Sequence, residues 1–157
     1  MIADKNGNEE FLSDNIWQLF VQQVQSTKSV ILGSNAYKGL LEWPSKYMNA
    51  LSNIGKIVLS NQKSLSNLGA WQLANSPTEA LEILSNSGIT TVTIGGGSKM
   101  ASAFLKDQLI NEIIYVIEPV IKSEGIPSFS PADIEQKLEL ISHENIGGLV
   151  KLRYNLI

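Results

Sequence analysis

Three consecutive glycines separate a β-branched run from a helical pattern in this chain. The glycines at 95–97 follow residues 91–94, and apolar residues recur at helical spacing from Met100 onwards. Because glycine has no Cβ, such a turn can be tight and another molecule can approach its backbone closely. Unpaired N–H groups at the positive end of the helix dipole suit a phosphate or diphosphate. The same glycines also fit a plain strand-to-helix turn, because they match neither G-x-G-x-x-G nor G-x-x-x-x-G-K-[ST].

Strands and helices alternate along the first two thirds of the chain. Short apolar strands are predicted at 29–33, 56–60, 70–73 and 90–94. One helix is predicted to begin with Ser13 or Asp14 as its cap, and further helices are predicted at 36–41, 44–51, 76–88 and 98–106. Ser76-Pro77-Thr78-Glu79 is a capping box with proline at the first helical position. This alternation predicts a three-layer α/β/α fold, with a mostly parallel central sheet covered by helices on both faces.

The C-terminal third has a different pattern. A strand is predicted at 112–120, and residues 137–143 and 149–157 alternate between apolar and polar side chains. The segment 145–148 carries two glycines that can turn between them. These features predict an antiparallel hairpin added to the parallel sheet. Residues 1–4 read as the end of a very short strand, and the whole chain, 1–157, as one domain.

Composition excludes several classes of function. The chain has no cysteine and a single histidine, His143, which excludes thiol nucleophiles, thiolate zinc sites and multi-histidine metal sites. The net charge is −3, and the single arginine, Arg153, stands apart from scattered lysines, which argues against a nucleic-acid partner. No apolar run approaches the roughly 18 residues of a membrane span, and the first residues are too polar for a signal peptide. We therefore expect a soluble cytoplasmic protein without a bound metal.

Turn-forming and small polar residues follow three of the predicted strands. They are Gly33-Ser34-Asn35, Ser60-Asn61-Gln62 and Gly95-Gly96-Gly97-Ser98. Ligands of parallel α/β sheets bind beyond the carboxyl ends of the strands. Convergence of these three segments on one edge would distinguish a ligand site from a plain turn.

These segments, in this order, resemble the dihydrofolate-reductase-like superfamily, which includes the reductase domain of bacterial riboflavin biosynthesis. Residues 30–37 resemble the family's strand followed by Gly-Arg-x-Thr-Tyr, and residues 56–60 resemble its second strand with a terminal serine. The glycines, Leu109-Ile110-Asn111-Glu112 and the run from Glu118 to Phe129 follow the family's G-G-G … L-v-D-E … P-v-l-x-x-G-x-p-l-F pattern.

The resemblance implies a reduced nicotinamide dinucleotide, NADPH or alternatively NADH, bound across the strand ends. Gly33, Ser34, Asn35 and Ala36 would lie along the cofactor phosphates, and Ser60 and Asn61 would border the adenosine ribose. Ala3 would face the nicotinamide carboxamide through its backbone. The diphosphate would be held by the glycine turn and its flanking residues, Ile94, Gly95, Gly96, Gly97, Ser98, Lys99 and Met100.

The chain departs from the family pattern at both ends of this site. The family's arginine after the first glycine is replaced by Ser34, so a charge on the ribose phosphate would have to come from Lys38 or Lys63. The carboxylic acid that dihydrofolate reductases carry four residues before a phenylalanine corresponds to Ile16. Asp4 is the first candidate for substrate contact and proton supply, and Asp14 the second. Each also fits a plain exposed carboxylate, and Asp14 fits a helix cap.

Two kinds of function follow from these observations. The first is an NAD(P)H-dependent reductase acting on a pteridine or ribosylaminopyrimidine-type small molecule. The second is a degenerate module that binds a nucleotide, or nothing, without catalysis. A reductase for an unrelated carbonyl compound is a third, weaker reading. Riboflavin-type members usually pair through their sheets, so the resemblance implies a homodimer. Structural roles are expected for His143 and Glu112, packing for Tyr37 and Trp43, and no role is assigned to Glu9 or Glu10.

Overall fold

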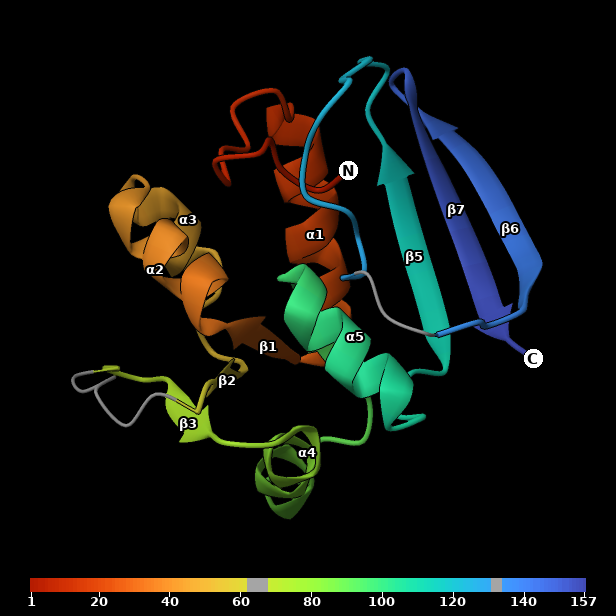
Figure 1. The fold of residues 1–157 in the computed structure, drawn as a ribbon. Helices are drawn as coiled ribbons and strands as arrows, with labels where there is room; N and C mark the ends of the chain where they lie inside the picture. Colours follow the sequence, from red (N-terminus) through yellow and green to blue (C-terminus); the bar gives the residue numbers. More distant parts are fainter. Residues whose placement is uncertain (62–67, 131–133) are drawn as a thin grey trace.

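A four-stranded parallel sheet forms the centre of the fold, as the alternation of strands and helices predicts. The structure is a computed structural model that describes residues 1–61, 68–130 and 134–157 (Figure 1). The strands lie in the order β3-β2-β1-β4. Their bounds are β1 Ser29–Gly33, β2 Gly55–Leu59, β3 Gln72–Ala74 and β4 Thr93–Ile94. Polar residues 61–67 are expected to form a loop from the sequence, and all of them except Asn61 lie outside the described residues.

Helices cover both faces of this sheet and confirm the three-layer arrangement. Their bounds are α1 Asp14–Thr27, α2 Ser34–Glu42, α3 Ser45–Asn49, α4 Pro77–Asn86 and α5 Ser98–Lys106. Successive side chains of a strand point to opposite faces. Val30 and Leu32 of β1 therefore join one core cluster, with residues of α1 and α2. Ile31 joins the other, with residues of α4 and α5.

The C-terminal strands form a separate antiparallel sheet at one side of the molecule (Figure 1). Its order is β5-β7-β6, with β5 Glu112–Ile117, β6 Leu138–Ile146 and β7 Leu149–Leu156. The predicted hairpin is confirmed. Gly147 and Gly148 have φ of 59° and 92°, and the Gly148 N–H donates to Asn145 Oδ1 at 3.2 Å. These positive φ values explain why glycines occupy the turn.

The strand expected at residues 1–4 is reduced to one isolated antiparallel bridge, between Ala3 and Ile126. The chain turns immediately afterwards, because the Asp4 carboxylate accepts hydrogen bonds from the N–H groups of Asn6 and Asn8, both at 2.8 Å. An aspartate that binds the backbone ahead of it favours a turn over continued extension.

The two predicted helix starts have different outcomes. At α4 the capping box is confirmed, because Ser76 Oγ accepts from the Glu79 N–H at 3.2 Å and Glu79 returns a bond to the Asn75 N–H. At α1 the residue before the helix is Ser13, but its side chain does not cap. Its hydroxyl instead donates to the Glu118 carboxylate at 3.0 Å, so a long-range contact replaces the local one.

Candidate cofactor site

Two helices begin side by side at the carboxyl ends of neighbouring strands. Strands β1 and β4 are paired in parallel, and each runs through glycine into a helix, α2 after β1 and α5 after β4. The Gly95 N–H donates to the Ile31 carbonyl at 2.8 Å, and the Gly33 N–H donates to the Gly96 carbonyl at 3.5 Å. The N-termini of α2 and α5, with their positive dipole ends, thus meet at one edge.

The glycine turn leaves several backbone donors without partners. Gly96 and Gly97 have φ of 139° and 93°, which side-chain-bearing residues rarely adopt. Among the described residues, the N–H groups of Gly96, Gly97 and Ser98 donate to no backbone or side-chain acceptor. Such donors at a helix N-terminus can bind an anion. The turn therefore has the chemistry that a diphosphate requires.

Close packing surrounds this turn. A Cβ built on Gly95 would lie 2.7 Å from the Phe20 ring of α1 and 2.8 Å from the Leu32 side chain. A Cβ on Gly33 would lie 3.6 Å from the Gly96 carbonyl oxygen, and Met100 is buried beneath it. The structure thus brings together the predicted residues of the first and third strand ends, including Ala36, whose Cβ lies 3.8 Å from the ideal Cβ position of Gly96.

The end of β2 lies at the same edge. Leu59 pairs with Gly33, and Ser60 follows it. Ser60 is buried, and its N–H donates to the Ala74 carbonyl at 2.9 Å. Asn61 is exposed beyond it, as are Asn35 and Lys99 near the starts of α2 and α5, while Ser34 is half-buried. All three predicted segments therefore end at one edge of the sheet, although Gln62 and Lys63 lie outside the described residues.

Asp4 lies in the loop that precedes α1. Backbone hydrogen bonds, from Asn8 above all, lower the pKa of its carboxyl below the ordinary value, and the charge of Lys122 acts in the same direction. An open polar hollow of about 350 Å³ adjoins it, lined by Asp4, Lys5, Asn6, Ile121, Lys122, Ser123 and Glu124. The nearby Ala3 is buried, and its carbonyl already accepts the Ile126 N–H at 2.8 Å.

The lowered pKa of Asp4 predicts an acid-sensitive loop. A carboxyl with a depressed folded-state pKa stabilises the fold above its unfolded-state pKa, and this contribution is lost as the pH falls through the folded-state value. We expect the Asn6 and Asn8 amide protons to lose protection only below the ordinary carboxyl pKa of 3.8. NMR titration of both amides measures this. In Asp4→Asn their shifts should no longer follow a carboxyl titration, and an unchanged titration would contradict the assignment.

Asp14 begins α1 beside an aromatic cluster formed by Trp17, Phe20, Trp43 and Tyr47. Its Oδ1 accepts from the Tyr47 hydroxyl at 3.2 Å. Trp17 contacts the other three rings, with centroids 5.1–5.7 Å apart. Since Phe20 also packs on Gly95, the cluster connects α1 to the glycine turn. Trp43 is partly exposed, whereas Tyr37 is buried against Trp71 and has the packing role expected of it.

Glu9 is a carboxyl for which no role is predicted from the sequence. Burial raises the pKa of its side chain above the ordinary value. A raised pKa keeps more of the acid form near neutral pH, which is the form that can donate a proton. Periodicity and motif spacing could not single it out, because a residue outside the helices and strands carries no periodic pattern of burial.

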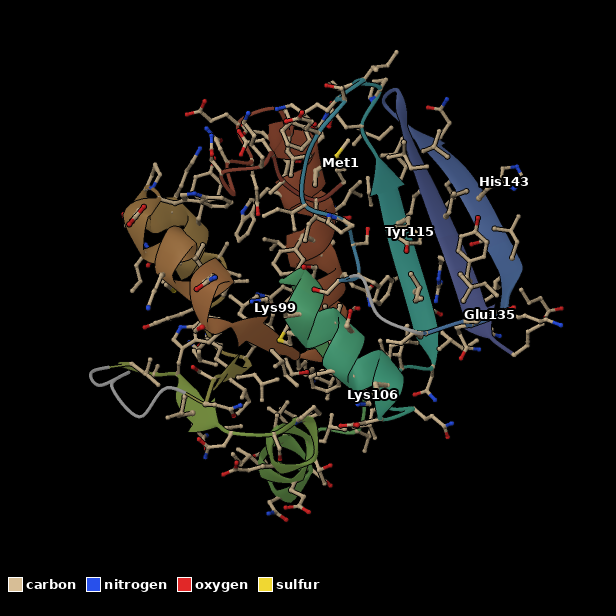
Figure 2. The ribbon with its side chains drawn as sticks, viewed as in Figure 1. Met1, Lys99, Lys106, Tyr115, Glu135 and His143 are labelled. Atoms are coloured by element: carbon tan, nitrogen blue, oxygen red, sulfur yellow. The ribbon has the colours of Figure 1, made fainter. Side chains whose placement is uncertain are left out.

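The remaining charged candidates lie away from the turn. Arg153 forms a two-pronged ion pair with Glu112 across β5 and β7, with its closest distance at 2.7 Å, and Glu112 thus has the expected structural role. Hydrogen bonding to Glu112 raises the pKa of Arg153 further. His143 is exposed on the outer strand β6, far from Lys99 at the start of α5 (Figure 2).

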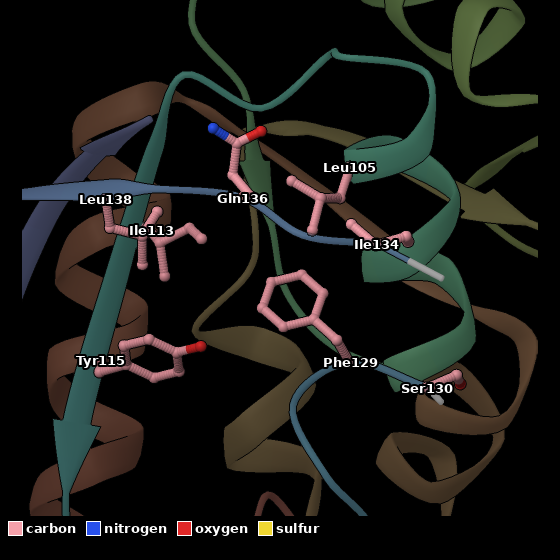
Figure 3. Close-up of a pocket in the computed structure, with 8 residues that line it drawn as sticks. All are labelled: Leu105, Ile113, Tyr115, Phe129, Ser130, Ile134, Gln136 and Leu138. Atoms are coloured by element: carbon pink, nitrogen blue, oxygen red, sulfur yellow. The ribbon is translucent and has the colours of Figure 1, made fainter. Parts of the chain in front are cut away.

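An apolar cavity of about 210 Å³ lies between α5 and the antiparallel sheet (Figure 3). Its walls are Leu105, Ile113, Tyr115, Phe129, Ser130, Ile134, Gln136 and Leu138. Two of the polar side chains, Gln136 and Ser130, are engaged elsewhere. The Gln136 amide donates to the carbonyls of Lys137 and Ile157, and Ser130 bonds to α5.

Across residues 1–61, 68–130 and 134–157, no helix is long and apolar enough to cross a bilayer.

A family comparison identifies the fold that carries this site. The family model of the RibD C-terminal domain matches residues 1–152. The chain belongs to the RibD C-terminal domain family. This membership confirms the resemblance drawn from the strand ends and the glycine run.

Solved structures agree with the RibD C-terminal domain assignment. A putative riboflavin biosynthesis protein from Shewanella sp. PV-4 superposes with a TM-score of 0.77 at 21% identity, over 99% of this chain and 92% of that one. A diaminohydroxyphosphoribosylaminopyrimidine deaminase/5-amino-6-(5-phosphoribosylamino)uracil reductase from Thermotoga maritima gives 0.70 at 17% identity, over 99% of this chain and 53% of that one. At these identities the likeness shows the fold, which is of the expected dihydrofolate-reductase-like class.

A curated sequence relative matches over a shorter stretch. The uncharacterized protein YwjB of Bacillus subtilis is 34% identical over 65 residues, which are 41% of this chain and 37% of YwjB. The match thus spans well under half of that relative.

Proposed function

We propose that this protein is an NAD(P)H-dependent reductase that transfers a hydride to a pteridine or ribosylaminopyrimidine-type substrate. One observation carries the proposal: within the part of the chain that the structure describes, the N–H groups of Gly96, Gly97 and Ser98 have no acceptor where the N-termini of α2 and α5 meet. Family membership and the reductase named in the Thermotoga structure support it. When bound, the dinucleotide supplies the hydride, and the protein positions its reactive ring against an electrophilic C=N or C=O.

The described residues support a division of the cofactor site. The glycine turn with Ile94, Lys99 and Met100 would hold the diphosphate, the start of α2 (Gly33, Ser34, Asn35 and Ala36) would follow the phosphates, and Ser60 and Asn61 would border the ribose. We propose NADPH as the cofactor and NADH as its competitor. The single arginine is already paired with Glu112, so a ribose phosphate would rely on a lysine point charge such as exposed Lys38.

At the substrate end, we propose that Asp4 contacts the substrate from the polar hollow beside it. Because its pKa is lowered, it acts as an ionised acceptor of substrate N–H or O–H groups rather than as a proton donor. Asp14 remains the second candidate for this contact. A proton would come from water or from a carboxyl with a raised pKa, and Glu9 is the described carboxyl that fits this description.

A second function, a nucleotide-binding or interaction module without catalysis, is favoured by one observation. The carboxylate nearest the N-terminal bridge is held by the backbone of its own loop, at Asn6 and Asn8, and the family's acid position on α1 is occupied by Ile16. A site built this way can bind a dinucleotide without delivering a proton.

One titration series separates the two functions. NADPH and NADH are titrated separately while their fluorescence is followed, and oxidation is then measured with dihydrofolate and with a ribosylaminopyrimidine. Saturable binding with turnover supports the reductase, and binding without turnover supports the module. If neither dinucleotide binds or raises the melting temperature at millimolar concentration, the reductase and the nucleotide-binding form of the module both fail.

We also propose that the protein is cytoplasmic and forms a homodimer through its antiparallel sheet, with neither nucleic acid nor membrane as a partner. On the sheet face that also lines the cavity beside α5, Ile117 lies opposite Val150 and Tyr154 opposite Leu140. Ile117, Val150 and Leu140 are 49%, 38% and 51% exposed. Burying such side chains against a second copy is favourable. Sedimentation equilibrium measures the association, and a monomer at all concentrations would contradict it.

A further inference from the structure

Serine hydroxyls tie the segment after β5 to the start of α5. Ser130 Oγ lies 3.2 Å from Ser98 Oγ, and the Ser130 N–H donates to Ser102 Oγ at 2.9 Å. Ser98 is the first residue of α5, directly after Gly97, and Ser102 is buried one turn later. Ser130 therefore contacts two successive turns of α5, and one of its contacts is a hydroxyl within the proposed diphosphate site.

A hydrogen bond between two hydroxyls can orient one of them toward a ligand. A serine hydroxyl carries one proton to donate and two lone pairs to accept. When Ser98 donates its proton to a phosphate oxygen, its own oxygen can accept the proton of Ser130. No proton is transferred in this arrangement, because each serine keeps its own. Ser130 then fixes the rotamer of the Ser98 side chain, so that less rotational freedom is lost when the ligand binds.

Two hydrogen bonds to α5 help to hold Ser130 in place. On the side away from the serines, the neighbouring Phe129 lines the cavity of about 210 Å³ between α5 and β5. Figure 3 shows Phe129 and Tyr115 on opposite sides of that space, with Ser130 against the helix. An open space on one side provides few contacts that could fix the segment. Loss of the serine contacts would therefore let Ser130 move.

We propose that Ser130 is a positioning residue for the cofactor diphosphate, which acts by orienting the Ser98 hydroxyl and is itself anchored by Ser102. This inference rests on the proposed function, because it requires a diphosphate at the glycine turn. It adds a residue far along the chain from the turn, outside every segment that the sequence pattern marked as cofactor-binding.

The test compares a ligand that has the diphosphate with one that lacks it. Calorimetric titration with NADPH and with adenosine 2′-monophosphate is carried out on wild type, Ser130→Ala, Ser130→Thr and Ser102→Ala. Loss of one neutral hydrogen bond predicts roughly three- to tenfold weaker NADPH binding by Ser130→Ala. Ser130→Thr keeps the hydroxyl and should bind as wild type does, while Ser102→Ala should lose affinity in the same direction. Binding of the monophosphate should stay within about twofold in all variants.

A double variant gives the sharpest reading. If Ser130 acts through Ser98, then Ser98→Ala/Ser130→Ala binds NADPH no more weakly than Ser98→Ala alone. The inference is overturned if Ser130→Ala binds NADPH as wild type does, if both ligands weaken equally, or if the two losses add. NADPH binding by the wild type distinguishes failure of the proposed function from failure of this inference alone. Without NADPH binding by wild type the proposed function fails and this inference fails with it, whereas wild-type binding with an unaffected Ser130→Ala removes the inference alone.

Discussion

Gly97→Ala is expected to weaken NADPH binding by about ten- to a hundredfold, which corresponds to losing one charge-assisted hydrogen bond. Gly97 has φ of 93°, and a Cβ there would meet only Met100, at 4.0 Å. The effect therefore comes from the backbone, because alanine strongly disfavours this φ and would relax toward negative values. That relaxation would reorient the N–H groups of Gly97 and Ser98, which are proposed to bind the diphosphate. Fluorescence titration with NADPH measures the change.

Gly88→Ala is the matched control for this prediction. Gly88 has φ of 79°, lies past the C-terminus of α4, and has open space around its ideal Cβ position. Gly88→Ala should lower stability by about 1–2 kcal/mol through left-handed backbone strain. Gly97→Ala should lower it by at least as much, because the ψ of Gly97, 110°, lies outside the left-handed helical region. Only the change at Gly97 should reduce NADPH affinity. Equal affinities in the two variants would show that the turn backbone does not bind the cofactor, and would remove the observation on which the proposed reductase depends.

Local signals in the sequence were sufficient for most of the parallel half of the fold. The β1 strand is apolar at the three positions before its glycine, Val30 to Leu32, because it is buried on both faces, and the capping box at Ser76 acts within four residues. Convergence of the strand ends follows from the parallel pairing itself. These features depend on short-range sequence patterns and on one general rule about sheets, so they can be read without coordinates.

Long-range contacts explain what the sequence could not predict. Ser13 looks like a helix cap, but Glu118, 105 residues away, binds its hydroxyl. Residues 1–4 look like a strand, yet within the described residues they form a single bridge, at Ala3, because Asp4 closes a turn with its own loop. The contact of Ser130 with Ser98 also joins distant segments. None of these pairings leaves a periodic or spaced pattern.

The division of the β structure into two sheets also depends on long-range contacts. The alternation at 137–143 and 149–157 predicts the β6–β7 hairpin, and the structure contains it. Which strand this hairpin pairs with depends on the position of β5, which follows α5 through a short connection. In the structure β5 pairs with β7 along six residues, from Glu112 to Ile117, and that ladder together with the Glu112–Arg153 ion pair completes a separate antiparallel sheet.

Gly95→Ala should destabilise the fold by about 1–3 kcal/mol and lower the melting temperature by roughly 2–12 °C. Unlike Gly97, this residue does not have a positive φ, so the effect comes from packing alone. The new methyl group would lie 2.7 Å from the Phe20 ring and 2.8 Å from the Leu32 side chain. Leu32 is almost fully buried and has no free space to move into, so the Phe20 ring and α1 must shift instead. Thermal unfolding followed by circular dichroism measures the loss.

Two further variants test whether Phe20 is the residue that clashes. Gly39→Ala, inside α2 with no atom within 4 Å of its ideal Cβ, should instead raise stability by about 0.5–1 kcal/mol, because alanine favours a helix more than glycine does. In a Gly95→Ala/Phe20→Leu double variant, the smaller side chain makes room for the methyl group. The double variant should lose less free energy of unfolding than the two single variants lose in sum, because residues in contact have coupled effects on stability. Strict additivity would place the strain elsewhere, and would break the connection between the aromatic cluster of α1 and the cofactor turn.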